Sequence, residues 1–361
     1  MRYAPTEGKN MTRLLLNASV SLIVLTNMPA AASELTLSVD VPSDLGRTTY
    51  LANQTFTAAG GSYALHFDGP AEGLDAALSI GALARREDGG ILFTSDVPFD
   101  VAGQTFTPRD VVLFDGADYA LYLSGDDLRL SGRARIDALS RTDNGALAIS
   151  FEQPETVGGV TYTPADVARI DAGTLSLHFD AGANGIPVDA NVVGYDETSS
   201  GERYFVFDAP VSIGASTFLP GQVVRFDGAD YGVFFEDPDF PQAAAASALS
   251  LPGSPGETTG LLVSKQVAQL QLAWDPACSS ESSDYGVFEG TIGDFASHLP
   301  VVCSTGGATQ QVVDPGAGQR FYLVVANNAM FEGSHGTDSS GKQRAPSADP
   351  CRTQQNVRAC P

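Results

Sequence analysis

The sequence repeats Thr105-Phe106-Thr107-Pro108 as Thr161-Tyr162-Thr163-Pro164 and again as Thr217-Phe218-Leu219-Pro220, at a constant spacing of 56 residues. The same step joins further sets of equivalent positions: Pro98, Pro154 and Pro210; Asp115, Asp171 and Asp227; and Phe67, Leu123, Phe179 and Phe235. Chance does not keep a register over such a length without an insertion or deletion. The chain is therefore a repeat protein, and its function is to be sought on a surface that repetition builds.

Each repeat has the pattern of short antiparallel strands. In the unit at 134–181, strands are expected at 136–141, 146–151, 160–162, 166–170 and 175–179, and the first two are joined by a tight turn at Asp143-Asn144-Gly145. Leu147, Ile149 and Phe151 alternate on one face of the second strand. No segment has helical periodicity of useful length, so the unit is a small antiparallel meander.

Tandem meanders of this kind predict a four-bladed β-propeller-like domain, because each blade buries its faces only against its neighbours. Complete units occupy 78–125, 134–181 and 190–237, whereas 35–68 lacks a first strand. A spare strand at 247–251 supplies it and closes the ring, so that no edge strand stays unpaired. An open or solenoidal β array is the alternative. The predicted fold class is all-β, a propeller-like repeat domain at 33–251 followed by an immunoglobulin-like sandwich.

The N-terminal segment resembles a secretory signal peptide. A basic start at Arg13 is followed by an apolar stretch and by the small-residue cleavage pattern Pro29-Ala30-Ala31-Ala32. We therefore expect a signal peptide at 1–32, a secreted or extracytoplasmic mature chain, and no membrane span after signal removal. Without residues 1–32 the net charge changes from −23 to −25, which makes nucleic acid a poor partner.

All four cysteines, Cys278, Cys303, Cys351 and Cys360, lie in the last quarter of the chain. In a secreted protein they predict two disulfides, and of the three possible pairings we favour the sequence-local one, Cys278 with Cys303 and Cys351 with Cys360. Turn-forming residues crowd at Pro252-Gly253-Ser254-Pro255-Gly256. We therefore place a linker at 252–260 and a second domain at 261–361.

The second domain carries three segments that are typical of one family. They are Leu270-Gln271-Leu272-Ala273-Trp274-Asp275-Pro276, Tyr285-Gly286-Val287-Phe288-Glu289-Gly290 and Phe321-Tyr322-Leu323-Val324-Val325-Ala326-Asn327-Asn328. Over roughly 257–348 the chain resembles a fibronectin type III sandwich, although that family generally has no disulfides. The resemblance implies a spacer, adhesion module or partner-binding platform.

Acidic turns are weak calcium candidates. Their residues are Asp115, Asp118, Asp227, Asp230 and Asp180. An Asp-Gly pair between strands is also what a tight hairpin requires, which favours a structural role and no cofactor. Likewise, His66 and His178 share a repeat position with Tyr122 and Phe234, which indicates packing rather than metal ligation.

Three classes of function follow. The first is a secreted, non-catalytic binding or scaffolding protein, not an enzyme, that presents repeat loops to an extracellular protein or glycan. The second is a carbohydrate-binding or calcium-assisted adhesin, with Phe99 and Phe240 as contact candidates. The third is a secreted glycoside hydrolase that uses Asp96, Glu152 and Asp208; their equivalence by repeat argues for a structural role, because catalysis needs two carboxylates in unlike environments.

Overall fold

The repeat region forms four separate four-stranded antiparallel sheets. The structure is a computed structural model that describes residues 34–59, 61–86, 88–142, 145–237, 240, 246–352 and 354–357. The predicted signal peptide at 1–32 lies outside these residues. Among them the only helical element is a short 3-10 turn, η1 (Gly182–Asn184), so the chain is all-β as expected.

Three of the sheets each come from one repeat, and their strands are as follows. The first holds β6 (Ile80–Arg85), β7 (Ile91–Ser95), β10 (Val111–Phe114) and β11 (Tyr119–Leu123). The second holds β12 (Ile136–Arg141), β13 (Leu147–Phe151), β16 (Val167–Asp171) and β17 (Thr174–Phe179). The third holds β18 (Val192–Glu197), β19 (Arg203–Phe207), β22 (Val223–Phe226) and β23 (Tyr231–Phe235).

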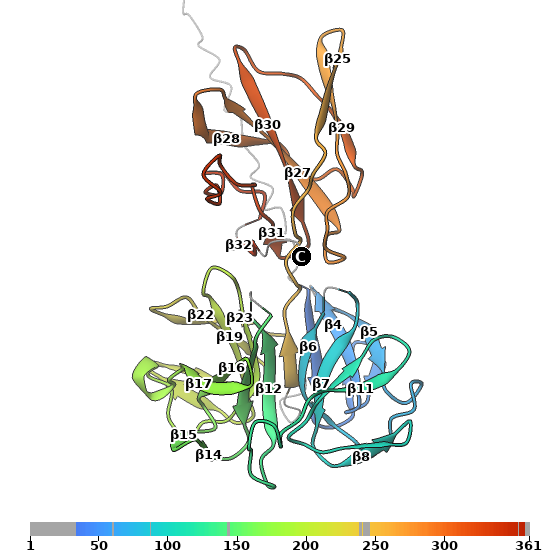
Figure 1. Cartoon of the computed structure of the whole chain (residues 1–361), viewed down its shortest axis with the longest axis vertical. Helices are drawn as coiled ribbons and strands as arrows, with labels where there is room; N and C mark the ends of the chain where they lie inside the picture. The colour runs from blue at the N-terminus through green and yellow to red at the C-terminus, as the bar shows by residue number, and fades with distance from the viewer. Residues whose placement is uncertain are drawn as a thin grey trace, which may run out of the picture. The chain divides into compact units, whose positions relative to one another are not determined.

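The fourth sheet joins the two ends of the repeat region. Its strands β1 (Leu35–Val39), β4 (Gln54–Ala59) and β5 (Ser62–Asp68) are completed by β24 (Ala246–Ser250), which pairs antiparallel with β1 through Leu37 and Leu249. The first strands of the four sheets, β6, β12, β18 and β24, contact one another around a central axis. The gold strand β24 in Figure 1 has β6 and β18 as its neighbours around this axis. The predicted closure into four blades is therefore confirmed.

A small hairpin projects between the second and third strand of every blade. The four hairpins are β2 (Ser43–Leu45) with β3 (Thr48–Tyr50), β8 (Phe99–Val101) with β9 (Gln104–Phe106), β14 (Glu155–Val157) with β15 (Val160–Tyr162), and β20 (Val211–Ile213) with β21 (Ser216–Phe218). The strand expected at 160–162 thus belongs to an accessory hairpin rather than to the blade. The recurring Thr-aromatic motif places Phe106, Tyr162 and Phe218 in the core at the base of these hairpins.

Buried hydroxyl groups tie each of three blades to the next. The Oγ of Ser38, the Oγ1 of Thr94 and the Oγ of Ser150 donate to the carbonyl oxygens of Ile80, Ile136 and Val192 at 3.3, 2.9 and 2.7 Å. The donors and the acceptors each follow the 56-residue step. At the fourth equivalent position stands Val206, which has no hydroxyl to donate.

Replacing Ser150 by alanine is therefore expected to lower the free energy of unfolding by about 1–2 kcal/mol, because it leaves a buried carbonyl without its side-chain donor. Chemical denaturation of the full chain measures this cost. Ser212→Ala is the matched control, since Ser212 is exposed on an accessory hairpin, and it is expected to change stability by less than about 0.5 kcal/mol. Equal costs for the two variants would contradict a special role for the inter-blade bond.

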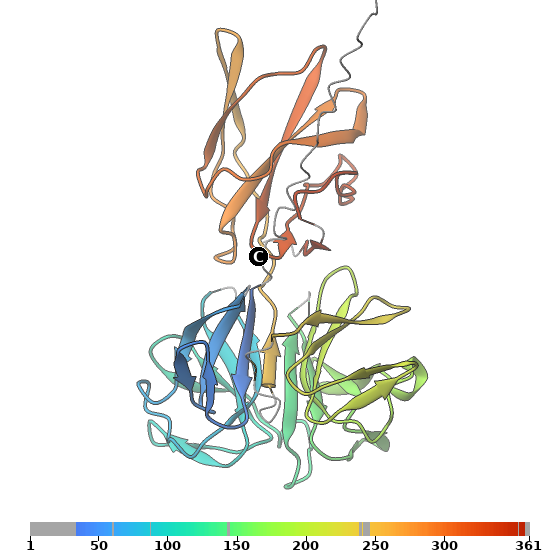
Figure 2. The same cartoon turned by 180° about the vertical axis from the view of Figure 1, so that it is seen from behind.

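The C-terminal region is a two-sheet β-sandwich (Figure 2). One sheet contains β25 (Leu262–Gln266), β26 (Gln269–Ala273) and β29 (Gln310–Val313). The other contains β28 (Asp294–Val302), β27 (Asp284–Thr291), β30 (Arg320–Asn327), β31 (Phe331–Glu332) and β32 (Gln354–Gln355). Leu272 and Trp274 pack against Tyr285, Val287 and Val324 between the sheets, as the period-2 pattern predicts.

The predicted disulfide pairing is wrong. Cys303 is bonded to Cys351, with an S–S distance of 2.12 Å, so neither sequence-local pair forms. Cys278 is also disulfide-bonded, whereas Cys360 lies outside the described residues. The bond links the end of β28 to a segment 48 residues further along the chain, and only the folding of the sandwich brings these two positions together.

Candidate functional site

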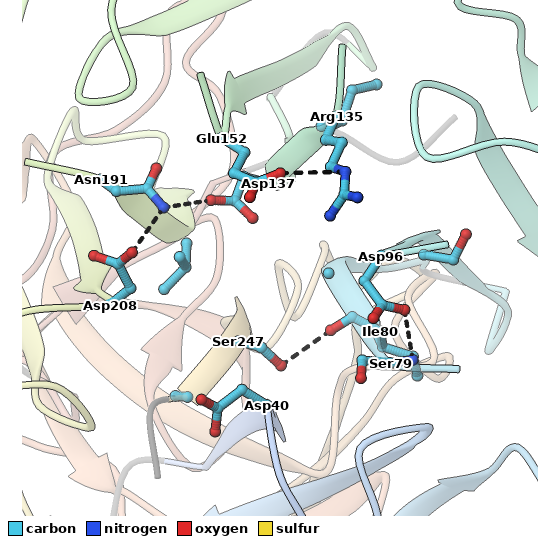
Figure 3. Close-up of a pocket in the computed structure, with 15 residues that line it drawn as sticks. Asp40, Ser79, Ile80, Asp96, Arg135, Asp137, Glu152, Asn191, Asp208 and Ser247 are labelled. Atoms are coloured by element: carbon cyan, nitrogen blue, oxygen red, sulfur yellow. Dashed lines mark hydrogen bonds and ion pairs between the residues drawn. The ribbon is translucent and has the colours of Figure 1, made fainter. Parts of the chain in front are cut away.

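A cavity of about 250 Å³ opens at the end of the central axis where the first strands of the blades begin (Figure 3). Four carboxylates line it, one from the end of the second strand of each blade, and they are related by the 56-residue step: Asp40, Asp96, Glu152 and Asp208. Ring closure brings together residues that are as many as 168 positions apart in the sequence. The axial pocket, as we call this cavity, is thus a product of the repeat architecture.

One carboxylate in the axial pocket does not follow the repeat. Asp137 lies near the start of β12, and the positions that the strand pairing makes equivalent in the other blades hold Gly81, Val193 and Ser247. An acidic side chain at a position that is neutral in the other blades is not needed to build a blade. Asp137 is therefore the strongest candidate for a functional residue, and the departure from the repeat is the sequence signal that could have revealed it.

Asn191 bridges Asp137 to the carboxylate ring. Its Nδ2 donates to Oδ2 of Asp137 at 2.8 Å and to Oδ2 of Asp208 at 3.0 Å, so the two carboxyl groups lie on either side of one amide nitrogen (Figure 3). On the other side of the pocket, Nε of Arg135 lies 3.3 Å from Oε2 of Glu152. Asp137 thus faces two other carboxylates and one guanidinium.

These surroundings make Asp137 chemically unlike its neighbours. Burial raises the pKa of Asp137 to about 7; the amide of Asn191 opposes the rise, Glu152 and Asp208 add to it, and Arg135 opposes it. Asp208 is exposed to solvent. Near neutral pH the pocket therefore combines a carboxyl group that holds a proton with an accessible carboxylate, which is the arrangement that general acid–base chemistry uses.

The remaining ring carboxylates differ in what they contact. Oδ1 of Asp96 accepts the backbone N–H of Ser79 at 2.8 Å, which fixes the entry into β6. Ser247, from the closing strand, donates to the carbonyl of Ile80 at 3.0 Å. On this side of the pocket the polar groups hold the strands together, in agreement with the structural role expected for repeated acids. The side that contains Asp137 instead brings a protonated carboxyl group close to the exposed carboxylate of Asp208.

The two aromatic contact candidates are buried, which corrects the expectation that they are presented to a ligand. Phe99 is 8% exposed and packs 5.2 Å from the ring of Phe106, while Phe240 is 7% exposed and lies 6.5 Å from the ring of Phe56. Each anchors a loop onto the blade core. Large aromatic rings in propeller loops gain more from burial than they could contribute as isolated surface contacts.

The carboxylates considered as calcium ligands accept backbone hydrogen bonds within their own turns. Oδ1 of Asp115 accepts the backbone N–H groups of Ala117 and Asp118 at 3.0 and 2.9 Å, and these bonds lower the pKa of Asp115. Asp227 has the same bonds to Ala229 and Asp230. Oδ1 of Asp180 accepts the N–H of Ala183 at 2.8 Å. Within the described residues no three His, Cys, Asp or Glu side chains are grouped to hold a metal ion.

The repeated aromatic position accommodates histidine in two different environments. Burial and, to a smaller extent, the nearby charge of Arg85 lower the pKa of His66 to about 4. Nε2 of His178 lies 2.7 Å from Oε2 of Glu197, a residue of the next blade. Both histidines thus contact the first strand of the following blade, and neither lines the axial pocket.

Comparisons with known proteins identify no family for this chain. No family model matches the chain, and no curated protein matches it. The solved structures that it resembles include a streptogramin B lyase, at 11% identity and a TM-score of 0.25, with 72% of this chain and 64% of that chain covered. A provisionally assigned gluconolactonase matches at 15% identity and a TM-score of 0.27, with 69% and 90% covered. Regucalcin from Agrobacterium tumefaciens, titled a calcium-binding protein, matches at 15% identity and a TM-score of 0.26, with 67% and 85% covered.

These comparisons correct the expectation that the chain is not an enzyme. The solved structures that resemble it include a lyase and a protein assigned as a lactonase. The match covers less than two thirds of the lyase chain. Candidate chemistry therefore has to come from the side chains of the axial pocket.

The part of the chain that the structure describes contains no helix that is long and apolar enough to cross a membrane.

Proposed function

We propose that the protein is a hydrolase that cleaves a glycosidic bond in the axial pocket, with Asp137 as the general acid and Asp208 as the nucleophile. The observation that carries this proposal is the position of Asp137, an acid outside the repeat pattern with a raised pKa, next to an exposed carboxylate on the same bridging amide. Two carboxyl groups in unlike environments are what glycoside hydrolysis requires.

The reaction balances with these two groups and one water molecule. The protonated carboxyl of Asp137 gives its proton to the glycosidic oxygen while the bond from that oxygen to the anomeric carbon breaks. The carboxylate of Asp208 forms a bond to the anomeric carbon, because the two carboxyl groups share one amide nitrogen and lie as close together as a nucleophile and an acid require. A water molecule then forms the bond to that carbon as the bond to Asp208 breaks, and the carboxylate of Asp137 takes a proton from the water. The products are two sugars with free hydroxyl groups, and both carboxyl groups return to their starting states.

Asn191 has a positioning role in this scheme. Because its amide nitrogen donates to both carboxyl groups, it fixes their separation and orientation before a substrate binds. A pocket of about 250 Å³ accommodates roughly one sugar unit. The substrate would therefore be cleaved at or near a chain end.

We also propose that the mature protein works outside the cytoplasm and that residues 261–361 are a fibronectin type III-like module. The signal-like N-terminus and the Cys303–Cys351 disulfide support the location, because disulfides persist in oxidising compartments. Buried Trp274 at the end of an early strand and the long strand β30 support the module. Such a module would hold the catalytic ring near an extracellular glycan.

The proposal is tested with the purified mature chain and a panel of nitrophenyl glycosides that differ in sugar and in anomeric configuration, assayed from pH 4 to pH 9. We expect release of nitrophenol from at least one glycoside, with a rate that falls above pH 7 as Asp137 loses its proton. An equal rate in Asp137→Asn would contradict the assignment of the acid. Hydrolysis of none of the glycosides would contradict the proposed reaction.

A further inference from the structure

A second cavity, of about 560 Å³, adjoins the axial pocket and has the opposite charge. Arg135 and Glu152 line both cavities, so the two are neighbouring parts of one cleft. Two further arginines, Arg109 and Arg133, line the second cavity, and Glu152 is the one acidic residue among those that line it. We call this cavity the arginine cavity.

The arginines of this cavity break the repeat in the same way as Asp137 does. The positions equivalent to Arg109 hold Asn53, Ala165 and Gly221; those equivalent to Arg133 include Ala77 and Asp189; and those equivalent to Arg135 include Ser79 and Asn191. In a chain with 20 basic and 43 acidic residues, three arginines around one cavity are a marked local excess of positive charge. Among the described residues, the side chains of Arg133 and Arg135 hold no backbone group of a blade, whereas Arg109 also donates to the carbonyl oxygen of Leu130.

Arg109 is held at the wall of the cavity, because its Nη1 donates to the carbonyl oxygen of Leu130 at 3.2 Å and pairs with Asp126 at 2.8 Å. The other two arginines can turn to a ligand at little cost. Arg135 pairs with Glu152, and both of these side chains are well exposed. Exposed ion pairs contribute little to stability, so an incoming anion can replace them. In the described part of the chain, Arg133 is exposed and no hydrogen bond or ion pair is found for its guanidinium.

We propose that the arginine cavity recognises the negatively charged group of a sugar acid, so that the substrate of the axial pocket is a uronate-containing oligosaccharide. This inference rests on the proposed function for the cleaved bond and adds the substrate class. Planar guanidinium groups match the two oxygens of a carboxylate, whereas the carboxylate ring of the axial pocket repels anions. Such a substrate would place its carboxylate against Arg133 in the arginine cavity and its glycosidic bond beside Asp137 in the axial pocket.

Binding measurements test this inference separately from turnover. The catalytically impaired variant Asp137→Asn is titrated by calorimetry with glucuronic acid, with glucose and with inorganic sulfate at low ionic strength. We expect glucuronic acid to bind at least 10-fold more tightly than glucose, and this ratio to shrink as salt is added. Adding Arg133→Ala is expected to lower the ratio about 5-fold to 10-fold, whereas Arg47→Ala, at an exposed arginine of the β2–β3 hairpin, leaves it unchanged.

Each outcome separates the two proposals. Equal binding of glucuronic acid and glucose overturns the sugar-acid inference, even if a neutral glycoside is hydrolysed. Sulfate that binds as tightly as glucuronic acid, with the same loss in Arg133→Ala, shows a site for free oxyanions and also overturns it. Preferential, Arg133-dependent binding of glucuronic acid supports the inference, and if the wild-type chain then cleaves no glucuronide, the hydrolase proposal fails while the recognition site stands.

Discussion

Replacing Asp137 by asparagine is expected to lower kcat/KM for a cleaved glycoside by about 100-fold to 10,000-fold, because the proton donor to the leaving oxygen is lost. Asn191 can still donate to the amide oxygen that replaces Oδ2, so the pocket keeps its shape. The measurement is a pH–rate profile. The residual rate of the variant should no longer fall above pH 7. Asp118→Asn is the control, since it makes the same change in charge on an exposed turn and should leave the rate unchanged.

The same substitution is expected to stabilise the protein above pH 7. The pKa of Asp137 is about 7 in the folded chain and 3.8 as a model value, so the folded state binds more protons than the unfolded state between these pH values. Stability therefore falls as pH rises through this window, and the loss is complete above pH 7. An asparagine at position 137 does not ionise, so the variant does not lose this stability as pH rises.

Asp137→Asn should accordingly raise the free energy of unfolding at pH 8 by roughly 1–3 kcal/mol, less than a shift of three pKa units would give for a fully buried group, because solvent screens part of it. At pH 4 the variant and the wild type should be equally stable. Denaturation curves at the two pH values measure both effects. A gain at pH 4 as large as at pH 8 would show that repacking, and not the carboxylate charge, is responsible.

Replacing Leu249 by aspartate is expected to open the ring. Leu249 is 1% exposed on the closing strand β24, where it pairs with Leu37 of β1. An unpaired charge at this position costs about 3–5 kcal/mol, which is a large part of the stability of a domain. Val233→Asp is the matched control, because Val233 is 47% exposed on the outer strand of a blade.

Hydrogen exchange shows which strands lose protection in Leu249→Asp. In Leu249→Asp the amides of β1 and β4, more than 180 positions away in the sequence, should lose protection together with those of β24, because the three strands form one sheet. In the control the protection of β1 should be retained. Loss confined to the residues around position 249 would contradict the closure, since it would mean that β24 does not hold the first blade.

Much of the ring could be predicted from the sequence because the strands of one blade are close together along the chain. The 56-residue step sets the strand positions, and the Asp-Gly turns at Asp115 and Asp227 form between neighbouring strands as expected. The missing first strand at the N-terminal end and the spare strand near Leu249 also predict closure, because an unpaired edge strand would be costly. These inferences need only the order of strands along the chain.

Contacts between distant residues could not be predicted in this way. The sequence-local disulfides were wrong because pairing depends on where β28 and the segment at Cys351 meet in the sandwich. Phe99 and Phe240 were candidates for ligand contact, but hydrophobic burial places both rings against the blades. The repeated acids were interpreted as structural, which suits Asp96 but misses the different surroundings of Glu152 and Asp208.

The sequence by itself thus determined that the chain is built from repeated four-stranded units and that its two ends complete one ring, because spacing and strand pattern act over neighbouring residues. Only the tertiary structure decided that Asp137, Asn191 and Asp208 meet in one axial pocket and that Arg133 lies in a cavity adjoining it. The physical reason is that closure brings the starts of all four blades to one axis. There, burial and neighbouring charges, which no single repeat contains, give Asp137 its distinct pKa.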